Sequence, residues 1–188
     1  MKQWIAAALV AFASAAHAGV AFIDGVLQGS DGSASNAYDF GTLDGTPSTL
    51  AVTTFGLPGS TFEEYANFTI AQDSAVSGVA NTYELSFFGI NLLDIDNLLI
   101  EVWNHSHPNG GALLGSFSGN NVSTGLGLLT AGDYHLDISG SFGTRAIGGQ
   151  YSVSLATVPA VPEPSTYALM LAGLGAVFFV ARRRRAEP

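Results

Sequence analysis

The chain has 188 residues and a net charge of −9, and it lacks cysteine, which excludes disulfides, thiolate metal sites and a cysteine nucleophile. Residues 19–160 contain thirteen acidic residues and one basic residue, Arg145, a net charge of about −12 before histidine. Nucleic acids and anionic lipid surfaces are bound through cationic side chains, so this composition excludes nucleic-acid binding.

The first 18 residues predict a secretory signal peptide. Lys2 supplies a positive charge, an apolar stretch follows over residues 4–12, and Ala16 and Ala18 give the small-x-small pattern that signal peptidase accepts. Cleavage after Ala18 would release an acidic extracytoplasmic domain. A permanent N-terminal anchor is the alternative, but the apolar run is shorter than the ~20 residues that a membrane span needs.

The acidic domain, residues 19–160, alternates apolar and polar residues in short stretches, which predicts strands with one buried face. The predicted buried faces, in chain order, are Phe62, Glu64, Ala66, Phe68 and Ile70; Tyr83, Leu85 and Phe87; Ile100 and Val102; Tyr134, Leu136 and Ile138; and Tyr151, Val153 and Leu155. Turn-forming clusters between these stretches favour an all-β, antiparallel sandwich or jelly-roll-like fold. Residues 140–149 are predicted to be a long hairpin loop joining the last two strands.

Asp94 and Asp96 are weak candidates for a calcium site, because their oxygens lie close together in the chain. The spacing and central glycine of an EF-hand are missing, and turn formation is the usual role of such residues. Asp31, Asp39 and Asp44 offer further oxygen atoms in the same way. No cofactor is expected beyond a weakly bound calcium ion.

Three histidines follow the predicted signal peptide, and two of them, His105 and His107, would share one side of a strand as half of a metal site. Their segment, however, has the composition of a turn. His135 alternates with core residues, so we expect it to face water. The sequence therefore favours solvated histidines over a transition-metal site.

No enzyme signature is present: the sequence lacks Gly-x-Ser-x-Gly, a Walker loop and His-Glu-x-x-His. Glu63 and Glu64 are adjacent on a predicted strand and would point to opposite faces, unlike the paired carboxylates of a glycosidase. We therefore predict no catalytic residues. Trp103 and Phe88 lie off the predicted core faces, and exposed aromatic rings can stack on sugars or fill a partner's pocket, unless a second sheet or a loop covers them.

The C-terminal segment, residues 161–188, combines Pro162-Glu163-Pro164, an uncharged apolar stretch over residues 165–181, and the basic cluster Arg182, Arg183, Arg184 and Arg185. The stretch predicts a single transmembrane helix whose arginines remain cytoplasmic, which places the acidic domain outside. The prolines are expected to hold Glu163 in an extended conformation that a protease could grip. Composition alone leaves open whether the anchor is permanent or transient.

These three parts, in this order, resemble the PEP-CTERM sorting signal of Gram-negative bacteria. The resemblance implies processing by the membrane enzyme exosortase near Pro162-Glu163-Pro164, transient anchoring in the inner membrane, and delivery to the cell surface or extracellular space. Because such proteins accompany exopolysaccharide systems, it also implies a noncatalytic protein of the matrix or biofilm. A carbohydrate-binding or calcium-dependent adhesive module is the alternative.

The domain itself carries a second resemblance. Its late strands, with Gly132, Tyr134 and Tyr151, look like the end of a bacterial pre-peptidase C-terminal domain. Residues 60–188 resemble the FxDxF family of PEP-CTERM proteins more closely, with Phe62-x-Glu64-x-Ala66 in place of Phe-x-Asp-x-aromatic. This resemblance implies a small β-sandwich joined to the sorting signal.

Overall fold

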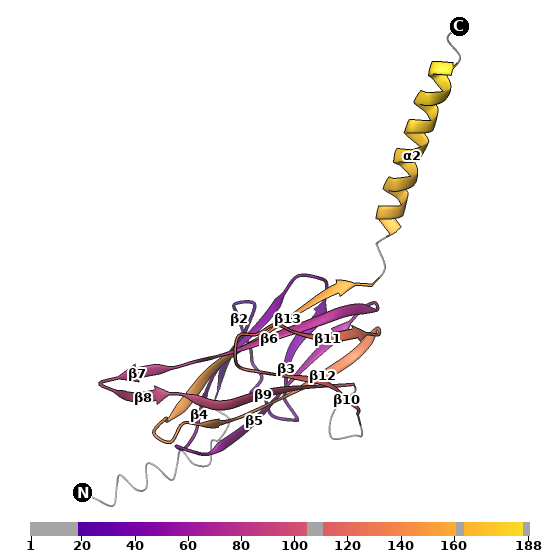
Figure 1. Ribbon diagram of the computed structural model, residues 1–188. Coiled ribbons are helices and arrows are strands. Elements are labelled where there is room, and N and C mark those ends of the chain that lie inside the picture. The colour runs from indigo at the N-terminus through magenta and orange to yellow at the C-terminus, as the bar shows by residue number, and fades with distance from the viewer. Residues whose placement is uncertain (1–18, 105–110, 161–163, 186–188) are drawn as a thin grey trace, which may run out of the picture.

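The computed structural model describes residues 19–104, 111–160 and 164–185, and shows two β-sheets, a small hairpin and one helix (Figure 1). The six-stranded sheet comprises β1 (Val20–Ile23), β2 (Val26–Leu27), β4 (Ser48–Phe55), β6 (Ser74–Tyr83), β11 (Thr124–Leu129) and β13 (Gly148–Pro159). The five-stranded sheet comprises β3 (Tyr38–Leu43), β5 (Thr61–Ile70), β9 (Ile95–Asn104), β10 (Leu113–Ser118) and β12 (Gly132–Phe142). The predicted all-β sandwich is confirmed.

The strand order is β11-β6-β13-β4-β1-β2 in one sheet and β10-β9-β12-β5-β3 in the other. Neighbouring strands run antiparallel, as predicted, except that β3 pairs with β5 in parallel. The predicted hairpin between the last two strands is wrong, because β12 pairs with β5 and β9, whereas β13 pairs with β4 and β6. The link between β12 and β13 crosses from one sheet to the other, which alternation within each strand cannot distinguish from a hairpin.

Alternation in β5 produces the core face as predicted. Phe62, Glu64, Ala66, Phe68 and Ile70 are buried, while the residues between them are more exposed. The predicted core faces of β9, β12 and β13 are likewise buried. In the described part of the chain, every residue of the hydrophobic core lies between Ala21 and Leu155, so residues 19–160 hold the whole core and can fold without the C-terminal helix.

The two sheets approach closely where glycine removes a side chain. A Cβ atom on Gly149 of β13 would overlap Ile95 of β9, and one on Gly78 of β6 would lie 2.5 Å from the ring of Phe117 in β10. These glycines let side chains of the opposite sheet pack directly on the backbone.

Tyr83, Leu85 and Phe87 do not form the single half-buried strand that was predicted. The strand ends at Tyr83, and β7 (Leu85–Phe87) pairs with β8 (Ile90–Leu93) in a separate hairpin that projects beyond the sandwich (Figure 1). Its turn holds Phe88 and Gly89 at φ of 49° and 76°, and Phe88 is 91% exposed. The apolar side chains at the tip and on β7, namely Leu85, Phe87, Phe88 and Ile90, are exposed, whereas Leu92 and Leu93 of β8 are half-buried.

The C-terminal helix α2 (Pro164–Arg185) begins at the second proline of the motif and continues through the arginines, beyond the predicted end at residue 181. Proline suits the first position of a helix because its missing N–H would have no partner there. Within the described residues, no helix meets the length and apolarity needed to cross a membrane. The span over residues 165–181 therefore stays a prediction. Ala16, Ala18, Pro162 and Glu163 lie outside the described residues.

Candidate functional site

The outer face of the five-stranded sheet, which points away from the core, carries three cross-strand rows of side chains. Antiparallel register places Asn67 of β5, His135 of β12 and Trp103 of β9 side by side in one row. The next rows are Tyr65, Asp137 and Glu101, then Glu63, Ser139 and Leu99. Because strand residues alternate between faces, the odd-numbered residues of β5 and β12 gather here, opposite the core.

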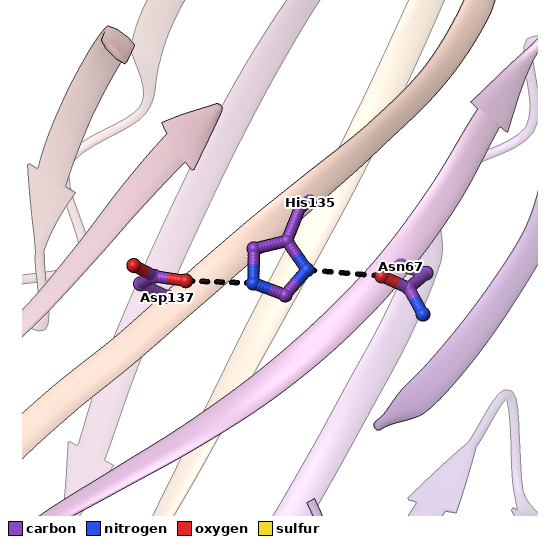
Figure 2. Close-up of polar contacts among 3 residues, drawn as sticks. All are labelled: Asn67, His135 and Asp137. Atoms are coloured by element: carbon purple, nitrogen blue, oxygen red, sulfur yellow. Dashed lines mark hydrogen bonds and ion pairs between the residues drawn. The ribbon is translucent and has the colours of Figure 1, made fainter. Parts of the chain in front are cut away.

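His135 is the centre of a polar network on this face, in which His135 and Asp137 are buried and Asn67 is exposed (Figure 2). Its Nδ1 lies 3.0 Å from Asn67 Oδ1, and its Nε2 lies 2.7 Å from Asp137 Oδ1. Both ring nitrogens can donate at once only when the ring is a protonated imidazolium. The network therefore fixes the ring from both sides.

The prediction that His135 faces water is wrong, since His135 is 5% exposed and Asp137 is 6% exposed. Tyr65 of β5 stacks on the His135 ring, and the partly buried Trp103 of β9 is the cross-strand neighbour of His135 on the other side. A residue on a central strand can thus be buried on the face away from the core.

Tyr65 stacks on His135, with ring centroids 5.3 Å apart and an angle of 23° between the planes. Partial burial raises the pKa of the Tyr65 hydroxyl, and the nearby carboxylates of Glu63 and Asp137 raise it further. The Tyr65 hydroxyl therefore stays neutral at ordinary pH. The stack on His135 holds the Tyr65 ring in a fixed orientation.

An open groove of about 650 Å³ adjoins Tyr65. Its lining combines hydroxyl, amide, carboxyl and apolar groups, contributed by Ser33, Ala34, Thr61, Phe62, Glu63, Tyr65, Asn97, Leu99, Ser139, Gly140 and Ser141. Asn97 has a φ of 57° where the β9–β12 register shifts, so a bulge shapes this end of the groove. The groove could not be predicted from the sequence, because no local pattern indicates a bulge or the loop that flanks it.

On the opposite, inner face of β5, Glu64 is 1% exposed within the core. The hydroxyl of Tyr151, from the other sheet, donates a short hydrogen bond to its carboxyl group. Burial raises the pKa of both Tyr151 and Tyr38, and the charge of Glu64 raises each further. The acidic position of the Phe-x-Glu-x-Ala segment thus joins the two sheets and does not line a site.

The candidate calcium ligands Asp94 and Asp96 do not form a common site. Asp94 Oδ2 accepts a 3.4 Å hydrogen bond from Asn91 Nδ2, whereas Asp96 is exposed on β9. Among the described residues, no three acidic or histidine side chains are grouped so that they could hold a metal ion. His105 and His107 lie outside the described residues.

The other candidate calcium ligands accept local backbone hydrogen bonds, Asp31 and Asp44 in loops and Asp39 at the irregularity in strand β3. Backbone N–H groups two residues further along donate to Asp31 Oδ1, Asp39 Oδ1 and Asp44 Oδ1 at 3.0, 2.8 and 3.0 Å. The hydroxyl of Thr46 also donates to Asp44, and these hydrogen bonds lower the pKa of that carboxyl. These local hydrogen bonds to the backbone account for all three residues.

Two kinds of comparison matched known proteins or motifs. Residues 160–185 match the PEP-CTERM protein-sorting motif. Among solved structures, the mitogen YPM from Yersinia pseudotuberculosis is similar with a TM-score of 0.39 and 11% identity, over 65% of this chain and 93% of that one. PliG from Salmonella Typhimurium, a periplasmic inhibitor of g-type lysozyme, is similar with a TM-score of 0.32 and 13% identity, over 65% and 100% of the two chains. These scores are too low to bear on function.

No curated protein matches the chain. The resemblances to the FxDxF family and to the pre-peptidase C-terminal domain stay predictions, because the match covers only the tail. That match includes the motif Pro162-Glu163-Pro164 and the four arginines on which the sorting prediction rests. The chain therefore carries, at residues 160–185, the PEP-CTERM protein-sorting motif, which is the sorting signal of an exosortase substrate.

Proposed function

We propose that this chain is a noncatalytic protein of the cell surface or extracellular matrix, which exosortase delivers and which associates with exopolysaccharide. The observation that carries the proposal is the PEP-CTERM motif at residues 160–185, which follows a single acidic domain with one core. In this proposal, signal peptidase acts after Ala18, residues 165–181 anchor the chain transiently in the inner membrane, and exosortase processes the tail near Glu163.

The noncatalytic assignment rests on the lack of catalytic motifs in the sequence and is supported by the His135 network. A histidine that serves as a general base has one ring nitrogen directed at the group it deprotonates. Here Nδ1 faces the Asn67 amide and Nε2 faces the Asp137 carboxylate, so both nitrogens are engaged within the sheet. The pair is better suited to holding an aromatic ring than to proton transfer.

The sorting step can be tested with the full chain in its host, carrying an epitope tag placed after Gly19. We expect the wild-type acidic domain in the extracellular fraction without its tail, and the full-length chain in the inner membrane when exosortase is deleted or Glu163 is replaced by alanine. Glu187→Ala is the matched control, because it removes the other carboxylate of the tail while keeping the motif. Unchanged release of the Glu163→Ala protein would contradict the proposal, and full-length wild-type chain retained in the membrane would indicate a permanent anchor.

A second candidate function is carbohydrate binding, and the groove beside Tyr65 favours it. Sugar sites combine an aromatic ring with carboxyl, amide and hydroxyl groups, and the groove offers these in Tyr65, Glu63, Asn97 and Ser139. Calcium-dependent adhesion has less support, since the described acidic residues are not grouped around a common point.

A further inference from the structure

The geometry points to a neutral polysaccharide chain as the ligand of the groove beside Tyr65. This inference rests on the second candidate function and deepens it by naming the ligand class, the contact surface and the residues that hold that surface in place. It stands on four observations: the groove's shape, its charge, its polar groups and the support behind its aromatic ring.

The groove is open to solvent and lies across strands β5, β12 and β9. At about 650 Å³ it is large enough for a ligand of a few sugar units. An open groove admits the interior of a chain, whereas a closed cavity accepts only a small molecule or a chain end. The shape therefore suits a polymer.

The charge of the groove excludes anionic ligands. Among its described lining residues, Glu63 is the charged group and no side chain is basic. The domain carries thirteen acidic residues and only Arg145 as a base, so it would repel a uronic-acid or sulfated chain. A neutral chain pays no such electrostatic cost.

The polar lining can pair with the hydroxyl groups of a sugar. Glu63 offers carboxylate oxygens, Asn97 offers an amide, and Ser139 offers a hydroxyl. Carboxylate and amide groups each hydrogen-bond sugar hydroxyls, as acceptor or as donor and acceptor. Leu99, which is 38% exposed, adds an apolar surface for the C–H groups of the same ring.

Tyr65 supplies the stacking surface, and the network in Figure 2 holds it in place. One face of the Tyr65 ring packs on His135, whose two nitrogens are held by Asn67 and Asp137. A ring already fixed before binding loses little conformational entropy when a ligand stacks on it. The buried His135–Asp137 pair thereby acquires a role, as a support for the ligand-binding ring.

Native affinity electrophoresis of residues 19–160 tests the inference. The gels contain one soluble polysaccharide each: dextran, laminarin or galactomannan as neutral chains, alginate as an anionic chain, and a soluble chitosan as a cationic chain. We expect retardation by at least one neutral polysaccharide and none by alginate. Tyr65→Ala should weaken that binding at least about tenfold, and Glu63→Gln should weaken it without disturbing the fold, since Glu63 is exposed.

Tyr83→Ala is the matched control, because Tyr83 is a half-exposed tyrosine on the six-stranded sheet, away from the groove. It should bind as the wild type does. His135→Gln should weaken binding less than Tyr65→Ala does, and Tyr65→Phe should retain most of the binding. Both variants keep an aromatic ring at position 65. Circular dichroism confirms that each variant is folded.

Failure to bind any neutral polysaccharide would overturn the inference, as would equal losses in Tyr65→Ala and Tyr83→Ala. Binding only to chitosan, removed by moderate salt, would overturn it in favour of diffuse attraction between opposite charges. The sorting experiment distinguishes failure of the groove inference from failure of the proposed function. A chain that is released into the matrix but binds no neutral polysaccharide contradicts the groove inference alone.

Discussion

Glu64 places a carboxyl group between the two sheets, where the hydroxyl of Tyr151 donates to it. Tyr38, fully buried, lies near the same carboxyl, and burial together with Glu64 raises the pKa of both tyrosines above their ordinary value. A buried acidic group of this kind is tolerated only when donors satisfy it, so the tyrosines and Glu64 form one unit. The unit links β5 to β13.

Tyr151→Phe should destabilise the domain at pH 8 by about 1–3 kcal/mol, because Glu64 loses this donor. The difference should shrink above pH 10. In the wild type, unfolded Tyr151 ionises near its ordinary pKa of about 10, whereas folded Tyr151, with its raised pKa, stays protonated. The unfolded state then binds fewer protons, so wild-type stability falls with pH, approaching about 1.4 kcal/mol per unit for this group.

Urea unfolding of both proteins at pH 8, 10 and 11 measures this effect. The phenylalanine variant has no hydroxyl to ionise at position 151, so its stability should fall less steeply with pH. A gap between the two proteins that is the same at all three pH values would show that the Tyr151 hydroxyl is not held neutral in the fold.

At the scale of strands, the sheets fit together because glycines stand opposite large side chains. Gly149→Ala would place a methyl group on Ile95, and such overpacking costs about 1–3 kcal/mol. Gly125→Ala is the control, since a Cβ there meets nothing within 4 Å and that glycine has no positive φ. Chemical denaturation should show a loss for Gly149→Ala and little change for Gly125→Ala.

A double variant separates the packing effect from backbone effects. Ile95→Ala should cost stability alone, but in combination with Gly149→Ala the total should be less than the sum, because the smaller side chain makes room for the new methyl group. Fully additive losses would mean that Gly149 is required for its backbone freedom and not for the contact with Ile95.

Alternation predicted which residues of β5, β9, β12 and β13 form the core, because a two-residue period fixes the side of a strand on which each residue lies. It could not predict the strands' neighbours, so the β12–β13 link was mistaken for a hairpin. Burial of the second face also depends on neighbours: alternation predicts that His135 faces solvent, yet Tyr65 stacks on its ring and Trp103 lies beside it across the sheet.

The candidate site was less predictable than the core. His135 and Asp137 stand two residues apart, so the sequence already placed them on one side of β12. The contacts of His135 with Asn67 and with the Tyr65 ring depend on the register between β12 and β5. These residues are 68 and 70 positions from His135 in the chain, and no local pattern encodes that register. The sorting motif of the tail was fully predictable, because it consists of consecutive residues and does not depend on how the domain folds.

At the scale of the whole molecule, the chain joins a strongly acidic domain to a basic C-terminal tail. The domain's thirteen acidic residues repel one another, and a single arginine offsets little of that repulsion. The repulsion destabilises the compact state and keeps separate copies of the domain apart. The four arginines are confined to residues 182–185. Removal of the tail would therefore release a strongly acidic domain into the extracellular space, where dissolved cations screen its charge.

Screening should raise the stability of residues 19–160, and diffuse screening does not distinguish calcium from magnesium. At pH 7, raising sodium chloride from 10 to about 200 mM should raise the melting temperature by about 2–4 °C, the shift that roughly 1 kcal/mol gives a domain of this size. Calcium and magnesium chloride at equal ionic strength should give equal shifts, because the described acidic residues do not converge on a point. A specific calcium site would instead add about 2.7 kcal/mol at one hundred times its Kd. Differential scanning calorimetry decides the matter: a calcium shift well above that of magnesium, and lost in Asp94→Asn, would establish a calcium site and contradict diffuse screening.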